Sequence, residues 1–308
     1  MHLVRSLILG LVFLSIPFLS APAIAGDLVL QPNNYVIDAS INGHPVRLRV
    51  DPSAPGYIIL NPAAVQRIGL RPSMTRARTT IGPVVLRGSS KTADVTIAGT
   101  TSERRLLWWD RAIVSEADGV VSIADLPYDR VTLTLGQPRA GEQAFQLPFQ
   151  RAAGSGLTHR MRVGDQELVL TITLNKPESL ATAAAGALIA QLHAGAWAGE
   201  PREEPVSFGV RRPVRPLALG QPMPIVAGLV LTRMLVRTQD HRGNAQLPRE
   251  ADADPEEIVV TAATGRRRPL YVLTLGRDWL APCSSVSWDN RTRLMTLNCV
   301  SGAVAPGS

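Results

Sequence analysis

The sequence predicts an all-β fold with a few short helices, built from a duplicated unit. Short apolar or alternating runs separated by Gly, Asn and Pro fill most of the chain, which is typical of strands. One order of elements (hairpin, break, short helix, several strands, closing hairpin) occurs twice, about 130 residues apart. The composition, 45% hydrophobic and 19% charged, is sufficient for a core and argues against wholesale disorder or a coiled coil.

In the first repeat, strands are expected at 28–30, 35–41 and 46–50, and Asn42-Gly43 is a two-residue hairpin turn between the last two. A short helix is expected after Asn61, its N-cap, with Gly69 as its stop. Its first residue would be Pro62, which is favoured there. Further strands are expected at 84–87, 93–97, 105–109, 119–123 and 131–135.

The second repeat begins after a polar seam at 151–156. A hairpin is expected over 161–174, followed by a break at Asn175-Lys176-Pro177. Ser179 would then cap an Ala-rich helix that runs to about His193. Closing strands are expected at 271–275, 286–288 and 294–297, and residues 239–257 form the longest expected loop.

The first 25 residues have the pattern of a secretory signal peptide. An apolar run of about 12 residues, 7–18, is too short to span a membrane. Ala23 and Ala25 supply the small side chains of a cleavage site, so the mature chain would begin at Gly26. The alternative is an uncleaved N-terminal anchor. We expect an exported protein, periplasmic or secreted, with no stable membrane span after cleavage.

Charge and metal-ligating residues exclude several function classes. Lys and Arg number 32 against 25 acids, for a net charge of +7, yet export makes nucleic acid an unexpected partner. The basic surface would instead meet anionic membrane or envelope polymers. Two Cys and five scattered His, without HExxH spacing, predict no metal site, and no cofactor motif is present. Aromatic residues, at 5%, argue against a base- or sugar-stacking surface.

Several segments resemble the retropepsin-like aspartic peptidases. Residues 46–55, followed by 58–60 and a short helix, resemble the family's hydrophobic strand, Asp-Thr-Gly loop and second strand. Residues 118–126 resemble its later Asp-Gly segment, and 275–280 with 286–289 and 294–297 resemble its closing segment. The resemblance implies a two-lobed, pepsin-like, duplicated retropepsin-type β-barrel fold. Its N-terminal lobe would be 26–150 and its C-terminal lobe 151–308, with a loop inserted near 239–257.

The family's reaction uses two carboxylates, one per lobe, that share a proton and activate a water. The resemblance places Asp51 at the first of these positions, either as a catalytic aspartate or as a relic carboxylate that caps a turn. Pro52 and Ser53 replace the family's Thr and Gly, and Asn175 occupies the partner position. An amide cannot act as a base. The expected flap, 76–95, lacks the Tyr usual in two-lobed members.

These departures predict a non-catalytic homologue that binds an extended peptide or protein in the cleft between the lobes. One alternative is an active aspartic endopeptidase that uses Asp51 in an unusual dyad, and another is a structural envelope protein. Asp278 is expected to be structural, because the family has an acid there outside the dyad. Of Trp108 and Trp109, one should lie in the core and the other be partly exposed, since neighbouring strand residues face opposite ways.

Two further features bear on the exported state. Cys283 and Cys299 flank a hairpin centred near 289–291 and should form a disulfide in an oxidising compartment. Residues 257–262 resemble the TonB box of outer-membrane receptors, a short strand that pairs with an energy-coupling envelope partner. The alternative for residues 257–262 is an ordinary strand of the second half. The basic run Arg266–Arg268 is either an interaction patch or a solvated turn.

Overall fold

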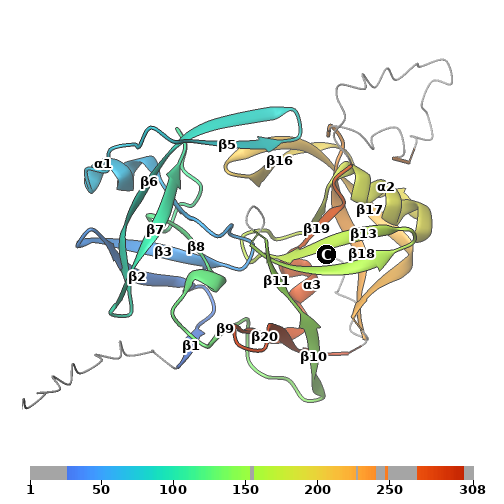
Figure 1. Cartoon of the computed structure of the whole chain (residues 1–308). Coiled ribbons are helices and arrows are strands. Elements are labelled where there is room, and N and C mark those ends of the chain that lie inside the picture. Colours follow the sequence, from blue (N-terminus) through green and yellow to red (C-terminus); the bar gives the residue numbers. More distant parts are fainter. Residues whose placement is uncertain (1–25, 153–155, 227, 241–246, 249–268, 302–308) are drawn as a thin grey trace, which may run out of the picture.

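The computed structural model of the chain describes residues 26–152, 156–226, 228–240, 247–248 and 269–301 (Figure 1). These residues are mostly β, as the sequence predicts, and they form three sheets. The expected signal peptide, most of the long loop, residues 257–262 and Arg266–Arg268 lie outside the described residues. No described helix has the length and apolar character needed to cross a membrane.

The first half of the chain forms a seven-stranded sheet that closes on itself. Its order is β2 (Val36–Ile41), β3 (His44–Asp51), β8 (Gly119–Ser122), β4 (Ile58–Leu60), β7 (Thr100–Trp108), β6 (Val84–Ile97) and β5 (Arg76–Ile81). Because β2 also pairs with β6, six of these strands make a closed ring. The two strands expected at 84–87 and 93–97 are parts of the single long strand β6.

The second half forms a nine-stranded sheet. Its order is β11 (Gln150–Ala152), β12 (Gly156–Val163), β13 (Gln166–Ile172), β19 (Val272–Leu275), β14 (Leu180–Ala181), β18 (Leu229–Arg237), β17 (Val210–Val226) and β15 (Gly195–Trp197). Strand β16 (Arg202–Ser207) pairs with β17 beside this path.

The third sheet joins the two halves. Its five strands are β1 (Asp27–Leu30), β9 (Arg130–Thr134), β20 (Cys283–Asp289), β21 (Leu294–Val300) and β10 (Glu142–Pro148). Strands from the beginning, middle and end of the chain therefore lie side by side in it. Apolar side chains of all three sheets belong to one buried cluster, so the core is continuous between the halves.

The same pairing scheme occurs in both halves. In the first half β3 is parallel to β8, β8 is antiparallel to β4, and β4 is parallel to β7. In the second half β13 is parallel to β19, β19 is antiparallel to β14, and β14 is parallel to β18. Each half also carries a hairpin, β5–β6 or β16–β17, at the corresponding place. The internal repeat expected from the sequence is therefore present in the topology.

Short helices lie between these strands: α1 (Pro62–Arg67), η1 (Ile123–Asp125), α2 (Ala183–Leu192) and α3 (Arg277–Leu280). Asn61 is the N-cap residue of α1 as expected, but its side chain makes no capping hydrogen bond. It binds the backbone of residues 113, 114 and 117 instead. The prediction that Ser179 caps the second helix is wrong. Thr182 is the cap, and the Ser179 hydroxyl donates to Asp278 Oδ1 at 2.8 Å.

The closing hairpin β20–β21 carries the predicted disulfide. Cys283 and Cys299 are direct partners in the antiparallel ladder and are bonded to each other, with their Cα atoms 3.8 Å apart. Both cysteines are buried, so the bridge ties the end of the chain into the sheet that joins the halves.

Candidate functional site

Asp51 lies at the centre of the molecule, at the end of β3. Val46, Leu48 and Val50 alternate along β3 and are buried, which gives the strand its core face. Asp51 is the last residue of the strand and is only 2% exposed. A buried carboxylate must find hydrogen-bond donors, because its transfer from water would otherwise be very unfavourable.

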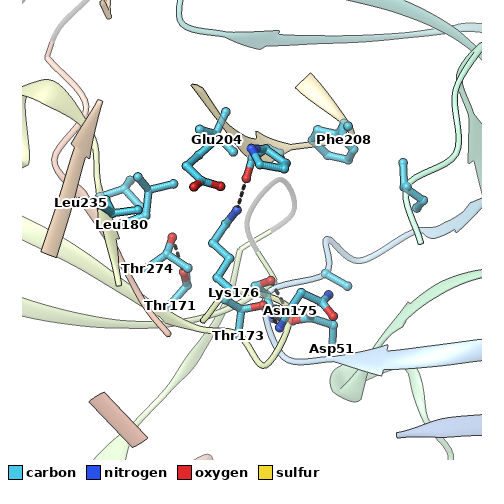
Figure 2. Close-up of a pocket in the computed structure, with 18 of the residues that line it drawn as sticks. Asp51, Thr171, Thr173, Asn175, Lys176, Leu180, Glu204, Phe208, Leu235 and Thr274 are labelled. Carbon is cyan, nitrogen blue, oxygen red and sulfur yellow. Dashed lines mark hydrogen bonds between the residues drawn. The ribbon is translucent and has the colours of Figure 1, made fainter. Parts of the chain in front are cut away.

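Four donors surround the Asp51 carboxylate. Oδ1 accepts hydrogen bonds from the backbone N and the Oγ of Ser53, each at 2.8 Å. Oδ2 accepts from Thr173 Oγ1 at 3.0 Å and from the side-chain amide of Asn175 (Figure 2). The Thr173 hydroxyl in turn accepts from the backbone N of Asn175 at 3.1 Å. No carboxyl group of a described residue is among the hydrogen-bond partners of Asp51.

This environment sets the protonation behaviour of the carboxyl. Burial raises the pKa of Asp51 above the ordinary value of 3.8, because a charge is poorly solvated there. The hydrogen bonds from Ser53 and Thr173, and the charge of Arg49, act in the opposite direction. The donors therefore stabilise the ionised form, and burial favours the neutral form.

The strand register identifies the counterpart of Asp51 in the second half. Helix α1 follows the short strand β4, which pairs with β8, and helix α2 follows the short strand β14, which pairs with β19. The two halves can therefore be aligned residue by residue, starting from the N-cap of each helix. The matched pairs are Asn61 with Thr182, Val121 with Leu275, and Val50 with Ile172. The next residue is Asp51 in the first half and Thr173 in the second. Asn175, which the sequence analysis placed at this position, lies two residues later.

Beside Asp51 a cavity of about 440 Å³ opens between β13, β14, β18, β19 and β16. Its apolar wall comes from Ile59, Val120, Leu180, Leu235 and Phe208, and its polar wall from Asp51, Thr171, Thr173, Lys176, Glu204 and Thr274 (Figure 2). This combination suits a ligand with an apolar group and a backbone or other polar part, as in a peptide.

Lys176 extends across this cavity. Its ammonium donates to the carbonyl of Pro205 on β16 at 2.6 Å (Figure 2). Burial lowers the pKa of Lys176, and the negative charges of Asp51 and Glu204 oppose that shift. Glu178 and Glu204 both pair with Arg202, so neither carboxylate contacts Asp51. The ammonium group of Lys176 therefore interacts electrostatically with both Asp51 and Glu204.

The tips of two hairpins, one from each half, contact the other half, and the β16–β17 hairpin also lines the cavity. The β16–β17 hairpin turns at Phe208 and Gly209. The ring centroids of Phe208 and Trp109 lie 4.8 Å apart. A Cβ added to Gly209 would lie 3.1 Å from the carbonyl oxygen of Ala112, so the backbone approaches the other half closely here. The β5–β6 hairpin turns at Gly82, where a Cβ would lie 3.0 Å from Asp240 Oδ1. Each hairpin tip therefore touches the other half of the chain.

Other predicted residues have structural surroundings. Asp278 Oδ1 accepts hydrogen bonds from Ser179 and from the backbone N of Trp279, both at 2.8 Å. Trp109 is 4% exposed and Trp108 is half-buried, as the strand pattern predicts. Thr173, Lys176 and Phe208 were not identified as site residues from the sequence, because nothing local marks them.

Within the described ranges there is no group of three or more His, Cys, Asp or Glu side chains that could hold a metal ion. No family model matches the chain, and no curated protein matches it.

Proposed function

We propose that this chain is an exported, two-lobed homologue of the pepsin-like aspartic peptidases that binds extended peptide without hydrolysing it. The observation that carries the proposal is the set of partners of Asp51. Where the family's reaction needs a second carboxyl group, Asp51 meets the hydroxyl of Thr173 and the amide of Asn175. Neither group can take up and return a proton as a carboxylate does near neutral pH.

The duplicated pairing scheme and the shared five-stranded sheet support the two-lobed interpretation. In that interpretation, the cavity beside Asp51 is the remnant of the substrate cleft. The hairpins β5–β6 and β16–β17 correspond to one flap from each lobe. Among the described strands, β5 ends its sheet and β16 pairs only with β17, so both can offer backbone groups to an added strand.

The binding mode follows from the lining. An apolar side chain of the peptide occupies the wall formed by Ile59, Leu180 and Leu235, and the peptide backbone pairs with a flap edge. The tip of the β16–β17 hairpin, which lines the cavity, also contacts Trp109 of the other half.

The test is selection of peptides from a displayed library with the mature protein, followed by affinity measurement on a blocked variant. Ser207 is exposed and lines the cavity, so Ser207→Trp fills the entrance with little effect on the core. Gln146→Trp places the same side chain on an exposed position of β10, outside this cavity. We expect S207W to weaken peptide binding at least tenfold and Q146W to leave it unchanged. Equal affinity in all three proteins would contradict the proposal.

A further inference from the structure

A second cavity, of about 460 Å³, shares no described lining residue with the first. Its lining comes from β3, α3, β20 and the residue after β9, and β9 and β20 belong to the sheet that joins the halves. Its apolar wall includes Leu135, Leu280 and the ring of Tyr35, whose hydroxyl donates to Thr134 O at 2.7 Å.

Three arginines line this cavity: Arg49, Arg139 and Arg277. Glu116 is the acidic residue among the described lining residues, and it pairs with Arg49. Arg139 and Arg277 are exposed and make no ion pair with any described residue. The lining therefore has three positive charges and one negative charge, which leaves an excess of two positive charges.

Arg49 is the most enclosed of the three, with a side chain 19% exposed. Its Nε is buried without a hydrogen-bond partner among the described residues, although one of its terminal nitrogens reaches Glu116. Burial lowers the pKa of Arg49; the charge of Asp51 opposes this shift, and the nearby positive charge of Arg277 adds to it. Arg49 and Arg277 therefore place two like charges close together in one cavity, an arrangement that an anion between them would stabilise.

We propose that this cavity binds a phosphate monoester, with the phosphate between Arg49 and Arg277 and the organic part against Leu135 and Leu280. A phosphate monoester carries a charge of about −1.5 to −2 at neutral pH, which matches the excess charge of the lining. Guanidinium groups bind phosphate oxygens in bidentate fashion, and Arg49 and Arg277 both line the cavity. The cavity has room for an organic group beside the phosphate.

The experiment measures binding of phenyl phosphate to the mature protein by titration calorimetry, with benzyl alcohol as the neutral control. Arg277→Gln and Arg139→Gln remove exposed guanidinium groups, so both variants should fold. Arg105→Gln removes an equally exposed arginine on β7, outside the cavity. We expect R277Q to weaken binding at least tenfold and R139Q to weaken it measurably, whereas R105Q and wild type should agree. Binding that is equal for benzyl alcohol or falls equally in R105Q would overturn the proposal.

A second arm separates a free phosphate from a lipid headgroup. Sedimentation with vesicles containing phosphatidic acid, compared with phosphatidylcholine alone, tests a phosphate monoester at a membrane surface. Vesicle binding that is lost in R277Q assigns the site to the lipid. Binding of phenyl phosphate without vesicle binding assigns it to a soluble ligand. The absence of both overturns the proposal and leaves the peptide cleft unaffected, because the two cavities have different linings.

Discussion

Replacing Thr173 by Val tests the hydrogen-bonded environment of Asp51 directly. The substitution keeps the shape of the side chain and removes the hydroxyl that donates to Asp51 Oδ2 at 3.0 Å. Both residues are buried, with 2% exposure each, so water cannot easily replace the lost donor. A hydrogen bond to a charged group contributes about 1.5–3 kcal/mol, and one to a neutral group about 0.5–1.5 kcal/mol.

The effect on stability must therefore depend on pH. Burial raises the pKa of Asp51 in the folded protein, so the folded state binds this proton more tightly than the unfolded chain does. The resulting stabilisation is complete below the ordinary pKa of 3.8 and is lost as pH rises through the raised folded value. T173V raises that value further. Its destabilisation should be about 1 kcal/mol larger above the raised folded pKa of Asp51 than at pH 3, because the partner is ionised only above that pKa.

Denaturant unfolding of wild type and T173V from pH 3 to about pH 9, the upper limit being set to reach the raised pKa of Asp51, measures this difference. Thr171→Val is the matched control, because Thr171 lies two residues before Thr173, at the end of β13, is buried, lines the same cavity and donates to the neutral Thr274 hydroxyl at 3.1 Å. Its destabilisation should not vary with pH. A T173V penalty that is as constant with pH as that of T171V would refute the assigned role of the Thr173 hydroxyl.

Three further predictions concern the fold and its processing. Reduction of the Cys283–Cys299 bridge, or its replacement by two serines, should lower the free energy of unfolding by about 3 kcal/mol, as measured by denaturant titration; unchanged stability would contradict this. Gly186→Ala should destabilise by about 1–3 kcal/mol, because its Cβ would lie 2.3 Å from Val236 Cγ1, whereas Gly136→Ala, in open space, should be neutral; equal effects would refute the packing argument. N-terminal sequencing of the exported protein should begin at Gly26, and detection of Met1 would support an anchor.

Features set by short-range chemistry could be predicted from the sequence. Asn42 and Gly43 form the expected turn, with φ of 49° and 78°, because these residues tolerate the left-handed region. The disulfide followed from equal strand lengths on either side of a turn. The alternation of apolar residues gave the strands of both halves.

Features set by tertiary contacts could not be predicted. Ser179 has the sequence context of a helix cap, but its hydroxyl is used by Asp278, 99 residues away. Thr173 directly follows β13 and is one of several threonines in this segment, and only the pairing of β13 with β19 shows that it corresponds to Asp51. Because the second half has no Asp-Thr-Gly motif, the sequence offered no fixed point for aligning it with the first half, and Asn175 was the polar residue chosen in the loop.

Incubation of the mature protein with a peptide that it binds tests the central claim most directly. Wild type and Asp51→Asn would be kept with the peptide from about pH 3 to pH 7, the range over which paired aspartates act. Mass spectrometry would follow the peptide, and a binding assay would confirm that the cleft is occupied. We predict that both proteins bind the peptide and that it remains intact at every pH. Cleavage by wild type that disappears in D51N would contradict the account and show that Asp51 acts without a second carboxylate at the Thr173 position.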